Sequence, residues 1–272
     1  MQIANGIKML ELSKNHMGKP LIAYPTLILD DPVILVDTGY PGQLPQIREA
    51  MAKAGVPLSK LKKVILTHHD ADHIGNTLSL QNELAIEVLA HEVEKPYLEG
   101  TKQSIRLAQL EALRNIMPEE TKTLQDNLKA FFENNKIKVA KTVTDGEELP
   151  YCGGITVIFT PGHTLGHICL YLRQSKTLIA GDALVVAGGK LYKALEFTNF
   201  DADLYEKTLH KLTEYDIEAV ICYHGGLYQE NINQRIAELV GKQNKKPSPE
   251  SLSKKLLKRL ESVMEQTLEN RI

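Results

Sequence analysis

The sequence has few cysteines, no long apolar run and no excess of charge of either sign. The cysteines form no CxxC pair, so they indicate neither a disulfide framework nor a zinc ribbon; they are Cys152, Cys169 and Cys222. No apolar segment approaches the ~20 residues that a membrane-spanning helix needs. With 32 Lys and Arg against 34 Asp and Glu, the net charge is −2, which argues against a dedicated nucleic-acid-binding protein.

The N-terminal segment also lacks the pattern of a secretory signal. Charged residues run through positions 1–20, and no apolar core of about 7–15 residues interrupts them. We therefore expect a cytoplasmic protein with reduced thiols, which acts on a small molecule and binds neither nucleic acid nor membrane. The 272 residues are 43% hydrophobic and 24% charged, which is enough for one large folded domain.

Strand-like apolar runs and helical segments are mixed along the chain. We expect one main domain over residues 1–242, with a helical insert at about 104–132, where leucines and phenylalanines recur at helical spacing. The polar segment 241–249 contains two prolines, and a last amphipathic helix over 249–270 follows it. Two interpretations of that helix stay open: it docks on its own domain, or it forms a homodimer contact.

The segment from His68 to His73 carries the strongest chemical signal. Five of its six residues are His or Asp, and they directly follow the apolar run 63–67. Imidazole and carboxylate groups are the main nitrogen and oxygen ligands for metals in proteins. Crowding so many of them at a strand end is costly without a cation, so a metal site is favoured over a polar turn with capping aspartates.

Three further segments place His or Asp at the end of an apolar run. His163 lies in the glycine-bracketed turn 160–167, Asp182 follows the run 178–181, and His224 follows the run 219–223. Glycines allow the backbone to come close to a ligand in such turns. One such histidine is more often structural, but four segments in this order favour a shared metal centre.

With Asp37-Thr38-Gly39 and the late His224, these motifs resemble the metallo-β-lactamase fold superfamily over roughly residues 1–240. The resemblance implies an α/β fold, an αββα four-layer sandwich with a two-metal site at one edge. It implies that one metal takes His68, Asp70 and His163, that the other takes Asp72, His73 and His224, and that Asp182 bridges the two. Asp37 is expected to orient a ligand imidazole. The role of His167 stays open, and the remaining histidines match no ligand position: His16, His69, His91 and His210.

Asp70 departs from the superfamily pattern, which has a histidine at this position. By simple counting, two divalent cations are balanced by Asp70, Asp72, Asp182 and a bridging hydroxide, which leaves a net charge of about 0. Such a centre should bind anionic phosphates less readily. An extra oxygen ligand also makes Fe or Mn plausible beside Zn, which is the metal we expect.

These features predict a metallo-hydrolase that acts on a small ester, lactone or thioester by attack of a metal-bridging hydroxide. Asp72 and Asp182 are the expected catalytic residues, since they fix the metals and could shuttle a proton. Tyr192 or Tyr223 is a candidate donor to the oxyanion. The insert could cover an apolar acyl group, or it could simply pack on the sheet edge. The alternative function is a non-haem diiron oxidoreductase or dioxygenase with the same ligands, because flavodiiron relatives also carry a carboxylate at the position of Asp70.

Overall fold

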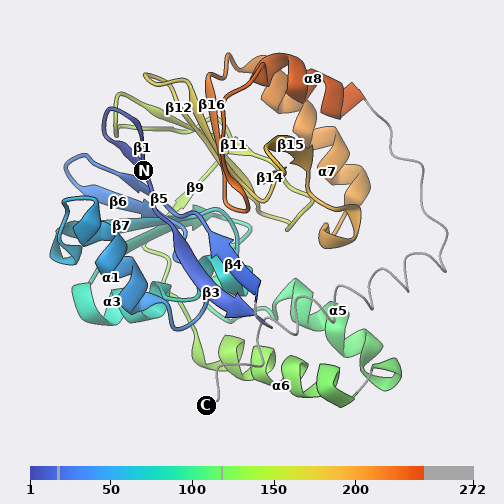
Figure 1. The fold of residues 1–272 in the computed structure, drawn as a ribbon. Helices are drawn as coiled ribbons and strands as arrows, with labels where there is room; N and C mark the ends of the chain where they lie inside the picture. Colours follow the sequence, from blue (N-terminus) through green and yellow to red (C-terminus); the bar gives the residue numbers. More distant parts are fainter. Residues whose placement is uncertain (17–18, 118, 242–272) are drawn as a thin grey trace.

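The structure, a computed structural model, describes residues 1–16, 19–117 and 119–241. Two β-sheets lie face to face, and helices cover the outer surface of each (Figure 1). The predicted αββα four-layer sandwich is therefore confirmed. The predicted helix at 249–270 lies outside the described residues.

The first sheet has seven strands in the order β1-β2-β5-β6-β7-β8-β9. The strands β6, β7, β8 and β9 pair in parallel, and the others pair antiparallel. Their bounds are β1 Gln2–Ala4, β2 Ile7–Met9, β5 Thr26–Ile28, β6 Val33–Val36, β7 Leu61–Leu66, β8 Glu87–His91 and β9 Lys141–Val143.

The second sheet has six strands in the order β10-β11-β12-β13-β16-β17, and only β13 and β16 pair in parallel. Their bounds are β10 Glu148–Leu149, β11 Ile155–Phe159, β12 Ile168–Leu172, β13 Thr177–Gly181, β16 Ala219–Cys222 and β17 Gly226–Tyr228. Two separate hairpins complete the strands: β3 Leu12–His16 with β4 Lys19–Ala23, and β14 Leu184–Ala187 with β15 Lys190–Lys193.

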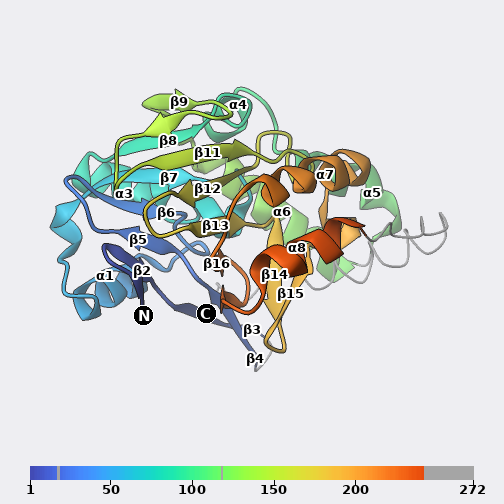
Figure 2. The ribbon, with the colours of Figure 1, turned by 90° about the horizontal axis from the view of Figure 1, so that it is seen from above.

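The helices form two outer layers and an insert (Figures 1 and 2). Beside the first sheet lie α1 Leu44–Lys53, α3 Thr77–Leu84 and α4 Lys95–Leu98, and beside the second lie α7 Ala202–Leu209 and α8 Ile232–Gly241. The insert contains α5 Ile105–Leu113 and α6 Glu119–Asn134, and the short α2 Ala71–Ile74 overlaps the His68–His73 segment and ends one residue after it. Within the described residues, 3-10 turns are present at Leu58–Lys60, Arg114–Ile116, Glu196–Thr198 and His210–Glu214.

The central strands are apolar on both faces because both faces are buried. In β7, Val64 and Leu66 pack with α1 and α3, whereas Ile65 between them packs against the second sheet. In β13, Leu178 packs toward α7 and α8, whereas Ile179 packs between the sheets. Alternate residues of a strand point to opposite faces, so a continuous apolar run is what a strand between two layers requires. The apolar area removed from water on both faces holds the strand ends in place.

The insert packs against the His68–His73 segment. The buried side chains of Leu110, Met117 and Leu128 join α5 to α6, and Ala71 packs against this cluster. The helical region predicted at 104–132 is present, and α6 continues to Asn134. Among the described residues, no helix combines the length and the apolar character that crossing a membrane requires.

Candidate metal centre

The candidate ligands follow strands that end at one edge of the sandwich. The His68–His73 segment begins two residues after β7, and Asp37 directly follows the parallel neighbour β6. In the second sheet, Asp182 directly follows β13, and His224 follows the parallel neighbour β16 with one residue between them. Because the carboxyl ends of parallel strands lie at the same edge of a sheet, distant parts of the sequence are brought together there.

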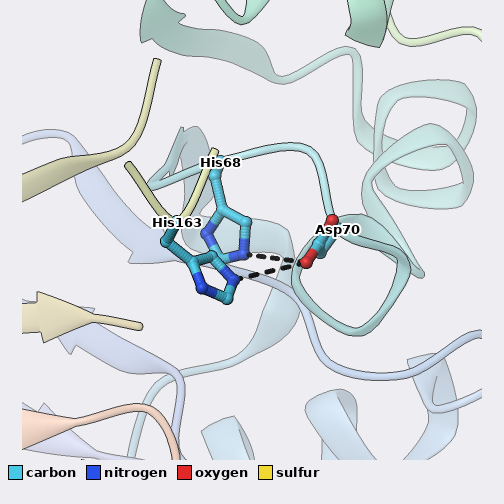
Figure 3. A group of neighbouring side chains, drawn as sticks. All are labelled: His68, Asp70 and His163. Carbon is cyan, nitrogen blue, oxygen red and sulfur yellow. Dashed lines mark ion pairs between the residues drawn. The ribbon is translucent and has the colours of Figure 1, made fainter. Parts of the chain in front are cut away.

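The structure brings all seven predicted ligand residues into neighbouring groups. Within each group, one ligand atom per residue lies within 4.8 Å of the others. The first ligand group is His68, Asp70 and His163, which Figure 3 shows with both imidazoles directed at the Asp70 carboxylate. The second ligand group is Asp72, His73 and His224, and a linking group consists of His68, His73 and Asp182.

The carboxylate of Asp182 lies between the two ligand groups. Its Oδ2 is 3.4 Å from Nε2 of His163. Its Oδ1 is 3.2 Å from Nε2 of His73 and 3.5 Å from Nε2 of His224. Each oxygen of one carboxylate therefore faces a different group, which is the arrangement that a bridging ligand needs.

Several inward-facing atoms are buried without a hydrogen-bond partner. They are Nε2 of His68, His73 and His163 and Oδ1 of Asp182. A buried polar atom without a partner costs free energy, typically 1–3 kcal/mol, so such atoms seldom gather in one place. A divalent cation accepts the lone pairs of imidazole and carboxylate at once, and these atoms therefore fit a metal.

The outward-facing nitrogens of the same imidazoles are all engaged. Nδ1 of His73 lies 2.8 Å from the Asp37 carboxylate, and Nδ1 of His68 lies 3.0 Å from Oγ1 of Thr67. Nδ1 of His163 lies 3.2 Å from Oδ1 of Asn199. A hydrogen bond at Nδ1 fixes the ring orientation and leaves Nε2 free for the site.

Asp37 is buried, and it anchors the end of β7 as well as His73. Its Oδ1 accepts from the Thr67 backbone N–H at 2.9 Å, and its Oδ2 accepts from the Thr67 hydroxyl at 2.7 Å. Its φ of 61° lies in the left-handed region, which aspartate adopts more readily than most residues. The contacts agree with the expected role of Asp37, which is to orient an imidazole.

The electrostatics of Asp70 include a cation that sequence reasoning missed. Nη2 of Arg106, in α5, lies 3.3 Å from Oδ2 of Asp70 and donates to the Thr198 carbonyl at 2.8 Å. Burial raises the pKa of Asp70, but Arg106 and the imidazoles of His68 and His163 outweigh burial and hold it well below its ordinary value. Burial holds the pKa of His68 well below 6.5, and a neutral imidazole is the form that binds metals.

His167 lies beside the centre, and both of its ring nitrogens are engaged within the protein. Its Nε2 accepts from the Asp182 backbone N–H at 3.0 Å, and its Nδ1 lies 2.9 Å from the Thr160 hydroxyl. Burial lowers the pKa of His167 to about 3, so the ring is neutral at pH 7. His167 therefore fixes the backbone at Asp182, and it belongs to none of the ligand groups.

Of the two tyrosines that the sequence suggested as oxyanion donors, Tyr223 does not fit that role. The hydroxyl of Tyr223 donates to the Asp72 carbonyl at 2.6 Å and accepts from the Gly39 N–H at 2.9 Å, so its one proton is already used. Its ring stacks on His73 with the ring centres 3.8 Å apart. Tyr192 is 41% exposed in the β14–β15 hairpin, where Arg235 lies over its ring. The oxyanion prediction for Tyr223 is therefore wrong, because burial commits its hydroxyl to the backbone.

Sequence reasoning also missed Glu94, Asn199 and Thr67, which hold the ligand segments without contacting their inward-facing atoms. Glu94 is fully buried and bonds to His69 and to the turn that follows His163. An acidic residue next to a proline-containing short helix gave no signal of this role. His69, His91 and His210, which match no ligand position in the sequence, lie outside the ligand groups found in the described part of the chain.

Known proteins resemble this chain in sequence and in fold. The model of the metallo-beta-lactamase superfamily matches residues 18–224. The chain is 26% identical over 217 residues to the protein named Probable metallo-hydrolase YqjP of Bacillus subtilis (strain 168), and the match covers 73% of this chain and 66% of YqjP. It thus spans slightly less than two thirds of that relative.

Two further proteins are matched over a larger share of their own length than YqjP. Probable metallo-hydrolase YflN, also from Bacillus subtilis (strain 168), is 27% identical over 226 residues, which cover 77% of this chain and 81% of YflN. The crystal structure of the metallo-beta-lactamase family protein TTHA1429 from Thermus thermophilus superposes with a TM-score of 0.67 at 23% identity. That superposition covers 88% of this chain and 79% of the other, and it shows a shared fold.

Proposed function

The chain belongs to the metallo-beta-lactamase superfamily, and from that premise we propose that it is a metal-dependent hydrolase of a small ester, lactone or thioester. The observation that carries the proposal is the convergence of unpartnered, buried Nε2 atoms on the Asp182 carboxylate. The relatives named as metallo-hydrolases support the same reaction class.

In this proposal, the two ligand groups would hold two divalent cations, Zn in the first instance. His68, Asp70 and His163 would hold one cation, Asp72, His73 and His224 would hold the other, and Asp182 would serve both groups. When bound, such a pair of cations supplies a nucleophile at neutral pH and polarises a carbonyl group. Asp182 maintains the spacing between the two groups, because each of its oxygens faces one of them.

Asp72 is the residue best placed to move a proton. Its Oδ2 lies 3.2 Å from Nε2 of His224, and both side chains are partly exposed, at 24% and 31%. The second ligand group is therefore the more open side of the centre, where a substrate and a leaving group can enter. A carboxylate at that edge can accept a proton from the nucleophile and pass it to the departing oxygen or sulfur.

An apolar acyl group suits the residues beside the first ligand group. The Phe200 N–H donates to the His163 carbonyl at 3.1 Å, and Phe200 is 44% exposed. Leu195, at the other end of the same loop, is 60% exposed. Of the five large apolar side chains that are exposed in the described part of the chain, two lie in this loop, which favours a substrate with an apolar part.

Arg106 modifies the charge argument for the substrate class. Its guanidinium adds one positive charge beside Asp70, so the local sum of about 0 rises to about +1. The centre is then no more anionic than one with a histidine at this position. The preference for a carbonyl substrate over a phosphate accordingly rests on the apolar loop more than on the charge count.

A test of the proposal combines elemental analysis with a substrate screen. We expect about two metal ions per chain and turnover of lactones, esters or thioesters that exceeds turnover of matched phosphoesters. The apolar loop predicts that activity rises with acyl chain length and that Phe200→Ala reduces this dependence. A metal-loaded protein that hydrolyses only phosphoesters would contradict the substrate class.

One observation supports the alternative function, a non-haem diiron oxidoreductase or dioxygenase. Asp70 gives the first ligand group an oxygen donor in place of an imidazole, and harder oxygen ligands favour Fe or Mn. Iron in the purified protein, together with oxygen consumption and no hydrolysis, would favour this alternative. Zinc with hydrolysis and no oxygen consumption would exclude it.

A further inference from the structure

Glu94 is a buried carboxylate that the proposed reaction does not use. It lies between β8 and α4, and it has no exposed surface. Both of its oxygens are engaged: Oε2 bonds to Nδ1 of His69, and Oε1 accepts from the Thr164 hydroxyl and from the Gly166 N–H, each at 2.7 Å. Burying a carboxylate is costly, and so complete a set of partners indicates a defined role.

The partners of Glu94 belong to the two segments that carry the first ligand group. His69 lies between the candidate ligands His68 and Asp70, whereas Thr164 directly follows His163 and Gly166 lies three residues after it. These segments come from different sheets, 25 and 70 or more residues away from Glu94 in the chain. One carboxylate thereby ties together the two backbones whose separation sets the distance between the ligand atoms.

Packing leaves little freedom in this connection. A Cβ atom added to Gly166 would lie 2.7 Å from Cγ of Glu94, so only glycine permits this approach. The His69 ring stacks on Tyr97 with a centre-to-centre distance of 4.6 Å and an interplanar angle of 11°. The connection through Glu94 is therefore held by packing at both Gly166 and His69, and such a rigid connection can hold ligands in place before a metal binds.

Asp37 has the corresponding position at the second ligand group. It too is buried and makes three hydrogen bonds, two to Thr67 and one to His73. Asp37 hydrogen-bonds directly to His73 and reaches the first ligand group only through Thr67, whose hydroxyl lies 3.0 Å from Nδ1 of His68, whereas Glu94 hydrogen-bonds to no member of the second group. The main supporting carboxylate therefore differs between the two halves of the centre.

We propose that Glu94 is a positioning residue specific to the first ligand group, and that it sets the separation between His68 with Asp70 on one side and His163 on the other. The proposal rests on the two-cation centre of the proposed function, and it adds a residue that acts on one cation alone. Loss of a residue that supports a metal ligand typically lowers metal affinity about 10–100-fold.

The test measures the two metal-binding steps separately. Metal-free protein is titrated with Co²⁺ and followed by its absorption spectrum, and affinities for Zn²⁺ are obtained by competition with a chromophoric chelator. We expect Glu94→Ala to weaken one binding step about 10–100-fold and to leave the other unchanged. Glu94→Gln keeps an oxygen for Thr164 and Gly166, so it should restore most of that loss.

Four further variants assign the affected step. Asp37→Asn should weaken the other step most. Glu99→Ala removes a carboxylate near Glu94 that does not bond to the ligand segments, and it should change neither step. In a protein that already carries His163→Ala, Glu94→Ala should produce no additional loss, since both act on one cation. In a His224→Ala background, its full effect on the remaining cation should persist.

The outcomes separate this inference from the proposed function. Wild-type affinities in folded Glu94→Ala and Glu94→Gln would overturn it, as would equal weakening of both steps in Glu94→Gln. A wild-type protein that binds a single ion would also overturn it. Two bound ions and a selective effect of Glu94, but no hydrolysis of any ester, lactone or thioester, would support the inference and refute the proposed function.

Discussion

Removing the hydroxyl of Tyr223 distinguishes a structural tyrosine from a catalytic one. The change Tyr223→Phe keeps the ring that stacks on His73 and deletes only the oxygen. That oxygen joins the Gly39 N–H, at 2.9 Å, to the Asp72 carbonyl, at 2.6 Å. Both groups belong to segments that follow strands of the first sheet, while Tyr223 follows β16 in the second.

The expected cost follows from the two groups that lose their partner. A buried N–H or C=O left without a partner costs about 1–3 kcal/mol. Gly39 is in a buried segment and Asp72 is partly exposed, so the lower half of that range suits Asp72. We therefore expect the free energy of unfolding to fall by about 2–5 kcal/mol. Turnover per bound metal should stay close to that of the wild type, since this hydroxyl has no proton to offer a substrate.

Urea denaturation of the metal-loaded proteins, with turnover normalised to metal content, measures both quantities. Tyr192→Phe is the matched control, because Tyr192 is 41% exposed, and a change at such a site should stay within about 0.5 kcal/mol. Loss of an oxyanion donor typically lowers kcat about 100–1,000-fold. A Tyr223→Phe protein with wild-type stability, full metal content and a loss of that size would refute the structural role.

Further changes test the centre itself. Asp37→Asn should weaken metal binding about 10–100-fold, most at the second ligand group, because one amide oxygen cannot serve the His73 N–H and both Thr67 donors as the two carboxylate oxygens do; competition titration checks this. Asp70→His should retain the metal and raise the net charge of the site by one, so the ratio of kcat/KM for phosphoesters to that for esters should increase; an unchanged ratio would contradict the charge argument. Asp182→Ala should abolish turnover with unchanged circular dichroism, whereas His224→Ala should leave partial metal occupancy. The losses in the double variant should not add, since these residues act as one unit, and full activity in folded Asp182→Ala would show that the two-cation mechanism is wrong.

The positions of the candidate ligands could be predicted because their signal is local. His68 follows an apolar strand within two residues, and the same is true of Asp182 and His224. Imidazoles and carboxylates are unusual directly after a strand that is buried on both faces, and the order of the segments matched a known arrangement. The fold class followed from the same resemblance, and the apolar strands are compatible with it because strands between two layers are buried on both faces.

The supporting residues could not be predicted in this way, because their partners are distant in sequence. Glu94 meets Gly166 across 72 residues, and Arg106 meets Thr198 across 92. Neither lies in a periodic pattern, and a charged residue near the start of a helix is ordinary. The error over Tyr223 has the same origin, since its hydrogen bond to Gly39 crosses 184 residues.

Some local structure was missed although a signal was present. The pair Gly188-Gly189 joins β14 to β15, and both glycines have positive φ, 54° and 73°. A Gly-Gly pair between two short runs is a typical hairpin turn. The apolar run 6–12 also predicts a single strand, whereas in the structure β2 ends at Met9 and β3, which belongs to another sheet, begins at Leu12. Alternation alone does not show where a chain leaves one sheet for another.

The origin of the candidate ligands has a consequence for the stability of the whole molecule. His68, Asp70, Asp72 and His73 extend from the first sheet, whereas His163, Asp182 and His224 extend from the second. A cation held among them is a cross-link between two layers that otherwise meet through apolar side chains. At a free metal concentration of 1,000 times its dissociation constant, each cation would add about 4.1 kcal/mol to the folded state by mass action. The resistance of this protein to unfolding and to proteolysis would then follow the supply of metal around it, so that metal starvation removes the protein itself as well as its activity.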